Sequence, residues 1–403
     1  MTVPVGCYMG SLAKQEQTEI RNAAVPDELL TAIATKDPVS GYTHNFYRYP
    51  ARFSPLFVRE VIRHYSRPGE VVLDPFMGGG TAIVEAVALG RRAIGVDLNS
   101  LAHFVATVKT TPLNSTDFTL LREWLADVQA VGRRGIGEIA EPVRNLPRHL
   151  QQVWTDLMAQ AAWLPIERQR RFVRCALLKT GQWAIDCRDS VPSGSETVKQ
   201  FAENVLGMLE GVEEFVGSCQ MRGLRRSKIC QNRLLLCRST AGLEKESKLG
   251  NVPKPTLVVT SPPYPAVHIL YHRWQVQGRR ETPAPYWLAA LNDGHPASHY
   301  TFGSRSPLGL ENYFRNVEEC FRSVRRVVAQ NAVVVQLVAF SHTESQLPRY
   351  LAAMELAGFA ECDALSISAD NRVWRSVPNR KWYCHNGREQ DSAKEVVLVH
   401  RPA

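Results

Sequence analysis

The feature that most constrains the fold is a short unit of strand, glycine turn, helix and strand. An apolar run at residues 71–73 closes on Asp74, and a helical stretch at 81–89 begins after three consecutive glycines. A second apolar run, at 91–96, closes on Asp97. This order of elements is typical of the start of a doubly wound parallel sheet, so we expect an α/β fold.

Later apolar runs predict that the sheet continues after a long interruption. They are short, rich in Val and Leu, and lie between turn residues, as the strands of a buried sheet do. The predicted strands are Arg233–Cys237, Thr256–Thr260, Ala332–Val338 and Lys394–His400. We therefore expect the C-terminal half of the chain to complete the sheet.

Helical periodicity replaces the strand pattern between residues 111 and 228. Apolar residues recur at helical spacing at Leu121, Trp124, Leu125 and Val128, and again at Val198, Phe201, Val205, Met208, Val212 and Phe215. This pattern predicts a helical insert. The loop Val191–Ser195 is expected to split the insert into two lobes.

A chain of 403 residues that is 44% hydrophobic can bury a sizeable core and form more than one domain. We expect an N-terminal arm at residues 1–40, with a short helix around Asp27–Ala34. The catalytic domain is expected to combine residues 41–110 and 229–403, with the helical insert between them.

The sequence favours a cytoplasmic protein without a membrane span. Its longest apolar run, Ala332–Phe340, is too short to cross a bilayer, and the N-terminus lacks the features of a secretory signal.

No two cysteines have the C-x-x-C spacing of a zinc site or redox pair, so we interpret them as reduced structural thiols and expect no metal. The cysteines are Cys7, Cys175, Cys187, Cys219, Cys230, Cys237, Cys320, Cys362 and Cys384.

The charge of the chain has two interpretations. The formal net charge is +9, and the 48 basic residues comprise 37 arginines and 11 lysines. A planar guanidinium binds phosphates and base edges well, which favours a nucleic-acid partner. A GC-rich genome, which encodes arginine in place of lysine, would give the same bias, so charge alone leaves the choice open.

The strongest local motif is Thr260-Ser261-Pro262-Pro263-Tyr264, directly after a predicted buried strand. Consecutive prolines cannot continue a central strand, so the motif should lie at the carboxyl end of that strand, where open α/β sheets bind ligands. The Ser261 hydroxyl and the Pro262 carbonyl would offer two acceptors to an amino group, and the Tyr264 ring would offer a face to a planar base. The alternative interpretation is a Pro-Pro turn after a core strand.

The glycine turn of the first unit, Asp74-Pro75-Phe76-Met77-Gly78-Gly79-Gly80-Thr81, is the second motif. Its glycines allow a ligand to approach the backbone closely, and the helix N-terminus behind them favours polar or anionic groups. The spacing differs from the dinucleotide pattern G-x-G-x-x-G, and Asp74 would repel a pyrophosphate. A carboxylate there suits a ligand with an ammonium group, such as the amino-acid end of S-adenosylmethionine (SAM), and Asp97 would bind the ribose hydroxyls.

In these motifs the chain resembles the amino-methylating DNA methyltransferases, which act on cytosine N4 or adenine N6. The glycine turn is similar to their cofactor motif D-P-F-x-G-S-G-T, with Gly79 in place of the usual serine, and the second motif is similar to their catalytic motif S/D/N-P-P-Y/F/W. Weaker similarities are Tyr49-Pro50-Ala51-Arg52-Phe53, which resembles a segment that packs on the cofactor, and Ile94–Asp97. The resemblance covers roughly residues 43–110 and 229–400. It implies the Rossmann-like, class I fold of SAM-dependent methyltransferases.

The resemblance also implies roles for individual residues, with SAM as cofactor and double-stranded DNA as substrate. The catalytic residues would be Ser261, Pro262, Pro263 and Tyr264, and the cofactor would be bound by Tyr49, Pro50, Phe53, Asp74, Phe76, Gly78, Gly80, Thr81 and Asp97. The target base would be flipped out of the duplex. Serine at position 261 favours cytosine N4 over adenine N6, and the order of the motifs nominates the insert, or the segment 275–310, for target recognition. Cognate restriction or defence proteins in the cytoplasm of a prokaryote are the implied partners.

Residues that follow the catalytic motif are candidates for DNA binding. Arg273, Trp274, Arg279 and Arg280 combine guanidinium groups with an aromatic face near the expected cleft. The alternative is a surface loop with solvated arginines and a core tryptophan. Further arginines at 168–174, on a helix predicted to begin at Pro165, and at 222–226 are interpreted as solvated helix faces.

Two rival functions remain open from the sequence. Methyltransferases of RNA or of protein glutamine amides share the sheet and a related N/D-P-P-Y motif, although serine at position 261 argues against them. A catalytically inactive, SAM-binding subunit would instead read DNA for a nuclease or defence complex. The presence of both acceptors and of Tyr264 argues against such a loss of activity.

Overall fold

The structure is a computed structural model of the chain. It describes residues 27–35, 37, 39–48, 53–131, 138–265, 274–276, 280–292, 297–304, 306–362, 372–376 and 394–403. No helix within these ranges combines the length and the apolar character that a membrane span requires.

A mixed sheet in the order β3-β2-β1-β4-β7-β10-β8 forms the centre of the molecule, and β9 also pairs with β10. The strands from β3 to β7 in this order are parallel, whereas β10 runs antiparallel to β7, β8 and β9. The bounds are β1 (Val71–Asp74), β2 (Arg92–Asp97), β3 (Arg233–Cys237), β4 (Leu257–Thr260), β7 (Val333–Val338), β8 (Phe359–Glu361), β9 (Val373–Ser376) and β10 (Lys394–Pro402). Each strand predicted from an apolar run is present, and the predicted doubly wound, mostly parallel α/β sheet is confirmed.

The winding of the sheet reverses between β1 and β4. Strand β1 pairs on one side with β2, the next strand in sequence, and on the other side with β4, which comes more than a hundred residues later. In doubly wound sheets such a switch point leaves a crevice beyond the carboxyl ends of the two strands. Both predicted motifs begin at these two strand ends.

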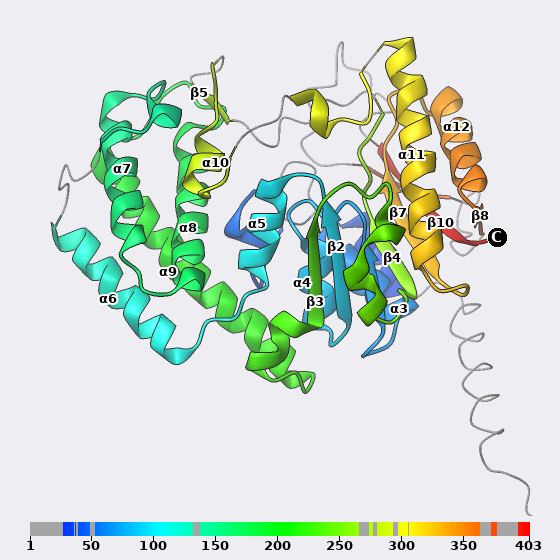
Figure 1. Ribbon diagram of the computed structural model, residues 1–403, viewed down its shortest axis with the longest axis horizontal. Helices are drawn as coiled ribbons and strands as arrows, with labels where there is room; N and C mark the ends of the chain where they lie inside the picture. The colour runs from blue at the N-terminus through cyan, green and yellow to red at the C-terminus, as the bar shows by residue number, and fades with distance from the viewer. Residues whose placement is uncertain are drawn as a thin grey trace, which may run out of the picture.

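Alternate strand residues face opposite sides of the sheet and pack into two cores. In β1, Val72 belongs to one core, whereas Val71 and Leu73 belong to the other. Helices α3, α4 and α5 lie in the first core, and α11 and α12 cover the opposite face (Figure 1). Their bounds are α3 (Pro55–Tyr65), α4 (Thr81–Ala88), α5 (Ser100–Lys109), α11 (Pro307–Val327) and α12 (Thr343–Leu356). The parallel strands are thus buried on both faces, which accounts for their continuous apolar sequence.

The predicted helical insert contains α6 (Ser115–Val131), α7 (Arg148–Ala162), α8 (Glu167–Ile185) and α9 (Gly194–Met221). The expected division into two lobes is wrong, because α8 and α9 pack against each other in one core. Asn204 on α9 donates a 2.9 Å hydrogen bond to the Thr180 hydroxyl on α8. Helix α9 starts at a capping box formed by Ser193 and Glu196.

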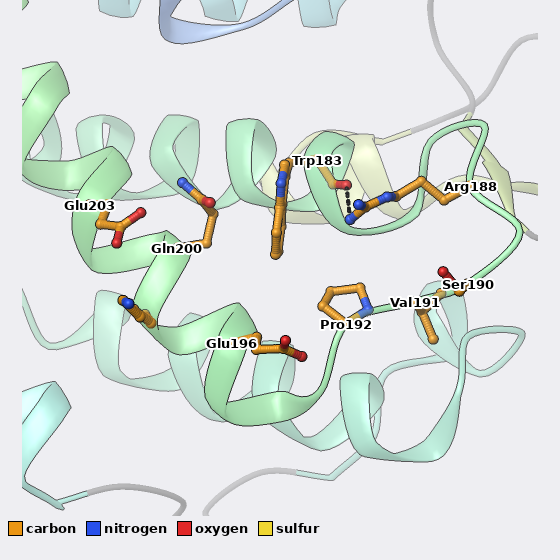
Figure 2. A pocket seen from close by; sticks show the side chains of 9 residues that line it. Trp183, Arg188, Ser190, Val191, Pro192, Glu196, Gln200 and Glu203 are labelled. Carbon is orange, nitrogen blue, oxygen red and sulfur yellow. Dashed lines mark hydrogen bonds between the residues drawn. The ribbon is translucent and has the colours of Figure 1, made fainter.

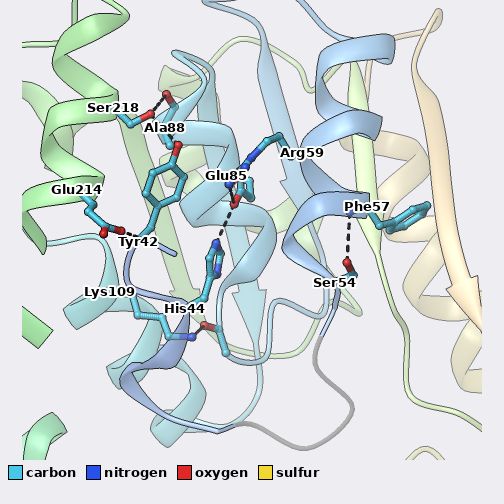
Figure 3. A network of polar contacts seen from close by, with 11 residues as sticks. Tyr42, His44, Ser54, Phe57, Arg59, Glu85, Ala88, Lys109, Glu214 and Ser218 are labelled. Atoms are coloured by element: carbon cyan, nitrogen blue, oxygen red, sulfur yellow. Dashed lines mark hydrogen bonds and ion pairs between the residues drawn. The ribbon is translucent and has the colours of Figure 1, made fainter. Parts of the chain in front are cut away.

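The insert also shares its core with the sheet. One continuous cluster of buried apolar residues includes side chains of α9 and of α3 to α5. Tyr42 lies at the junction: its backbone N–H donates to Glu214 at 2.9 Å, and its hydroxyl contacts that of Ser218 at 3.0 Å (Figure 3). Gly211 approaches so closely that a Cβ there would lie 2.3 Å from the Tyr42 carbonyl oxygen. The boundaries expected for the insert are therefore boundaries in sequence and not breaks in packing.

Helix α2 (Asp27–Ala34) confirms the short helix predicted in the N-terminal segment. Its apolar residues Leu29 and Ile33 are buried in the first core, and the helix packs on α3. This part of the expected arm is packed against the domain, and residues 1–26 lie outside the described residues.

A hairpin and a short helix extend the insert from far along the chain. Strands β5 (Trp274–Val276) and β6 (Arg280–Thr282) pair antiparallel, and α10 (Ala284–Leu288) follows them. In Figure 1, β5 and α10 lie at the same end of the molecule as α8, and α8 contacts both of them. Short 3-10 helices complete the described elements: η1 (His44–Phe46), η2 (Glu141–Val143), η3 (Arg226–Asn232), η4 (Leu243–Lys245), η5 (Ser247–Asn251) and η6 (Ala297–Tyr300).

Candidate active site

The ends of β1 and β4 bring the two motifs together. Leu73 pairs with Val258 in the sheet, so Asp74 and Thr260 end neighbouring strands. The Thr260 hydroxyl donates a 2.7 Å hydrogen bond to Asp74 Oδ1 across 186 positions of sequence. Ser261 follows Thr260 directly, so the catalytic motif and the glycine turn lie at the same rim of the sheet.

The glycine turn is held in a compact conformation by backbone hydrogen bonds. Met77 N–H donates to the Val96 carbonyl at 2.9 Å, and Gly80 N–H donates to the Met77 carbonyl at 2.7 Å. Gly80 has a φ of 77°, and a Cβ there would lie 2.8 Å from Ala106 Cβ, so only glycine fits. The buried Lys109 ammonium donates to the Gly79 carbonyl at 2.8 Å (Figure 3). Lys109 is a contributor to the turn that the sequence analysis missed.

Asp97, at the end of β2, is tied to the same turn. Its Oδ2 accepts a 2.9 Å hydrogen bond from Gly78 N–H, and its Oδ1 accepts one of 2.8 Å from Asn99 N–H. Phe76 is half-buried, and its ring meets that of Phe302 edge to face at 5.5 Å. The two carboxylates therefore border one turn from two adjacent strands.

Burial raises the pKa of both carboxyl groups. The pKa of Asp74 rises to about 7, mainly because the group is buried and further because Asp97 is nearby, although Thr260 and Phe76 N–H partly oppose the shift. The pKa of Asp97 rises to about 6 through burial, against the hydrogen bonds from Asn99 and Gly78. The described contacts thus leave negative charge at this rim poorly compensated, which suits a ligand that brings an ammonium group and hydroxyl donors.

The predicted catalytic motif is held by hydrogen bonds within it and from α11. Tyr313 on α11 donates to the Pro263 carbonyl at 2.9 Å. The hydroxyl oxygens of Ser261 and Tyr264 lie 3.1 Å apart. Tyr264 is only 7% exposed and packs in the core under α11 and α12, so its ring is a packed side chain here and its expected stacking on a base stays a prediction.

Glu395 is a residue of this site that the sequence analysis missed. It lies in β10, is 5% exposed, and accepts a 2.8 Å hydrogen bond from the Tyr264 hydroxyl. Arg375 on β9, directly opposite Glu395 in the sheet, forms an ion pair with it at 3.5 Å. The available signal was the predicted strand at 394–400, but its direction relative to the other strands cannot be read from the sequence.

Among the candidates for DNA binding, the prediction that Trp274 offers an open aromatic face is wrong. It is 2% exposed, its indole N–H donates to the Tyr47 hydroxyl at 2.9 Å, and its ring packs edge to face on Trp154. It is therefore a core residue of the insert and not an open aromatic face. Arg273 and Arg279 lie outside the described residues, and the backbone of Arg280 lies in β6.

Other predicted residues have clear positions. Phe53 and Thr81 are each 7% exposed, and Phe53 packs on Phe57 of α3 with ring centroids 5.8 Å apart. Tyr49 and Pro50 lie outside the described residues. The arginines of α8, which begins at Glu167 and not at Pro165, are engaged in ion pairs, such as that of Arg168 with buried Asp117 at 2.7 Å.

A hollow of about 390 Å³ lies on the insert between the end of α8 and the start of α9. Figure 2 shows Trp183 and Pro192 facing it, with the Arg188 guanidinium bonded to the Trp183 carbonyl oxygen. Its lining residues are Trp183, Arg188, Ser190, Val191, Pro192, Glu196, Lys199, Gln200 and Glu203. This hollow is separate from the rim that carries the two motifs.

Part of the chain is similar in sequence to known DNA methyltransferases. Residues 13–107 match the N6/N4 methyltransferase family model, described as DNA methylase. Type II methyltransferase M.MjaII of Methanocaldococcus jannaschii is 30% identical over 87 residues, which is 22% of this chain and 16% of that protein. Type II methyltransferase M.MvaI of Kocuria varians is 38% identical over 74 residues, 18% of this chain and 16% of that protein. DNA adenine methyltransferase YhdJ of Escherichia coli is 36% identical over 55 residues, 14% of this chain and 19% of that protein.

The family match concerns the half of the site that holds the glycine turn. The chain spans about a sixth of the length of the two type II methyltransferases that it matches. The family match includes both Asp74 and Asp97, and it ends well before the catalytic motif at 260–264. Over residues 13–107, the chain is similar to the amino-methylating DNA methyltransferases.

Proposed function

We propose that this chain transfers the methyl group of SAM to an exocyclic amino group of a base in DNA. The observation that carries the proposal is the hydrogen bond between Thr260 and Asp74, because it joins the predicted amine-binding motif to the predicted cofactor turn at the switch point of the sheet. The sequence similarity of residues 13–107 to DNA methylases supports DNA as the substrate.

SAM fits the chemistry of the glycine turn. Both described donors to Asp74 reach Oδ1, so Oδ2 is available to the ammonium group of the cofactor. The Asp97 carboxylate, oriented by Gly78 and Asn99, can accept the ribose hydroxyls. When bound, SAM supplies a methyl group on a sulfonium centre, which an amine lone pair can attack. The raised pKa values of the two aspartates are consistent with a site that is completed by a cationic ligand.

The catalytic motif can activate an amine without a covalent intermediate. The lone pair of an exocyclic amine is delocalised into the base and is therefore a poor nucleophile. Hydrogen bonds from the two amino hydrogens to Ser261 Oγ and the Pro262 carbonyl favour tetrahedral geometry at the nitrogen and aim its lone pair. Tyr313 holds the adjacent Pro263 carbonyl, so the loop presents its acceptors in a fixed arrangement.

Cytosine N4 is the proposed target atom, with adenine N6 as the second candidate. Serine at position 261 is the feature that favours cytosine. The target base must leave the duplex to reach the rim, at a cost of a few kcal/mol. We further propose that the insert and the adjoining β5–β6 hairpin read the target sequence, because they form one continuous body beside the catalytic half.

Two rival functions predict different outcomes in one experiment. The full chain is incubated with tritiated SAM and, separately, with unmethylated phage DNA, total RNA and total protein. Label in DNA, recovered as N4-methylcytosine or N6-methyladenine after digestion to nucleosides, supports the proposal and identifies the base. Label in RNA or protein alone contradicts it, and tight SAM binding without any transfer favours an inactive DNA-reading subunit.

A further inference from the structure

We propose that Glu395 is a positioning residue that acts through Tyr264 to make Ser261 Oγ a pure hydrogen-bond acceptor. The inference rests on the proposed function, in which Ser261 accepts a hydrogen from the target amine. Glu395 lies on β10, which is outside both motifs.

The antiparallel direction of β10 brings Glu395 to the rim. The parallel strands β1, β4 and β7 end there, whereas β10 begins there, and Val396 pairs with Val338, the last residue of β7. Glu395 precedes Val396 and therefore lies beside the loop that follows β4. Its carboxylate is buried and accepts a 2.8 Å hydrogen bond from the Tyr264 hydroxyl.

The number of protons fixes the direction of the next hydrogen bond. A tyrosine hydroxyl has one hydrogen, and the Tyr264 hydroxyl gives it to Glu395. The 3.1 Å contact between the Ser261 and Tyr264 oxygens must then be donated by Ser261. With its only hydrogen turned toward Tyr264, Ser261 Oγ offers only lone pairs on its other sides.

This orientation decides what part of a base Ser261 can bind. Cytosine presents its N4 amino donor next to the N3 acceptor, so a serine that donates would bind N3 and a serine that accepts binds the amino group. The hydrogen-bond chain from Glu395 through Tyr264 to Ser261 selects the second arrangement. Arg375, paired with Glu395 at 3.5 Å from the adjacent strand, holds the carboxylate in place at the start of this chain.

The test compares single-turnover methyl transfer to unmethylated phage DNA, at saturating SAM, for the wild-type chain, Glu395→Gln, Tyr264→Phe and the double variant. Glu395→Gln keeps the shape of the side chain but removes the charge. We expect it to slow transfer about tenfold to a hundredfold, the effect of losing one hydrogen bond to a charged group, with the SAM dissociation constant unchanged. In the Tyr264→Phe background the same substitution should have no further effect, because the connection to Ser261 is already cut.

Matched controls separate positioning from stability. Glu361→Gln on β8 breaks a partly exposed ion pair with Arg372, and Tyr350→Phe removes another buried tyrosine hydroxyl from the same core. Both variants should transfer the methyl group at a rate within about twofold of the wild-type rate.

The outcomes distinguish this inference from the proposed function. An active wild-type chain with an equally active Glu395→Gln variant overturns the role of Glu395 alone. So does an effect of Glu395→Gln that persists at full size in the Tyr264→Phe background, because Glu395 would then act through overall stability. A wild-type chain that labels no DNA overturns the proposed function, and the role of Glu395 in amine binding falls with it.

Discussion

Two groups of buried carboxylates, one on α4 and one at the rim of the sheet, have opposite electrostatic environments. Glu85 lies on α4 and is fully buried. Its carboxylate forms a 2.8 Å hydrogen bond with the His44 imidazole and accepts hydrogen bonds from both Nε and Nη2 of Arg59 (Figure 3). Burial tends to raise its pKa, but the hydrogen bonds with His44 and Arg59 outweigh burial and lower it. At the rim, the donors to Asp74 and Asp97 among the described residues are one hydroxyl and backbone N–H groups, and burial raises the pKa of both.

The difference separates a structural carboxylate from one that awaits a ligand. A buried acid that serves the fold is neutralised by the chain itself, as Glu85 is by Arg59. An acid that serves binding leaves its charge to be compensated by the ligand, and the unliganded fold bears the cost. The comparison predicts opposite responses of the two sites to the same Glu→Gln or Asp→Asn change.

The largest effect is expected for Glu85→Gln. It leaves the Arg59 guanidinium without its buried counter-charge, so the free energy of unfolding should fall by about 3 kcal/mol. Urea unfolding at pH 7.5 measures this loss, with Glu167→Gln, an exposed carboxylate on α8, as the control. A loss below about 1 kcal/mol would show that the pair is not what stabilises this junction.

Asp74→Asn should spare stability and weaken cofactor binding. Asparagine keeps an Oδ1 acceptor for Thr260 and Phe76 N–H and removes the poorly compensated charge. We expect unchanged or higher free energy of unfolding at pH 8, and a SAM dissociation constant raised about tenfold to a hundredfold in calorimetry. Unaltered SAM affinity would contradict the assignment of Asp74 to the ammonium group.

SAM affinity should decrease as the pH falls from 8 to 6. The pKa of Asp74 in the free protein is raised to about 7, so the cofactor must displace a proton at lower pH. Affinity at pH 6 should be about tenfold lower than at pH 8, with proton release seen as a dependence of the calorimetric heat on the buffer. The stability of the unliganded chain has the opposite pH dependence. Because the pKa of Asp74 is raised in the folded state, the free energy of unfolding should increase as the pH falls through 7. An affinity independent of pH would place SAM away from Asp74.

The smallest effect is expected where a carboxylate is exposed. Glu167 on α8 pairs with Arg171 at 3.0 Å, and both side chains are nearly half exposed. Arg171→Ala should change the free energy of unfolding by no more than about 0.5 kcal/mol in urea, because solvent screens such pairs. A loss comparable to that of Glu85→Gln would mean that burial is not what distinguishes the three sites.

The sheet was predictable because its strands carry a strong signal. Strands such as β4 and β7 are buried on both faces and read as continuous apolar runs. β8 and β9 escaped prediction because they are short and mix polar with apolar residues. The short β5–β6 hairpin escaped for the same reason, and burial of Trp274 depends on Tyr47 and Trp154, which are distant in sequence.

The candidate site was predictable only where its residues follow strand ends. Asp74, Asp97 and Ser261 each follow an apolar run, and parallel strands end at one rim. Glu395 stands at the beginning of its strand, so it reaches the same rim only because β10 is antiparallel. That direction is decided by pairing between distant segments, which local sequence patterns do not encode.

The shared core of α9 and α4 has a consequence for how this protein can change its specificity. A helical insert joined to the sheet through Gly211, Tyr42 and a common apolar interior cannot be exchanged as a self-contained unit. Grafting a foreign helical segment between positions 111 and 228 would expose one side of α4 and destabilise the half that carries the two motifs. Under the proposed function, a change of target sequence is therefore expected from substitutions on the outer surface of the insert.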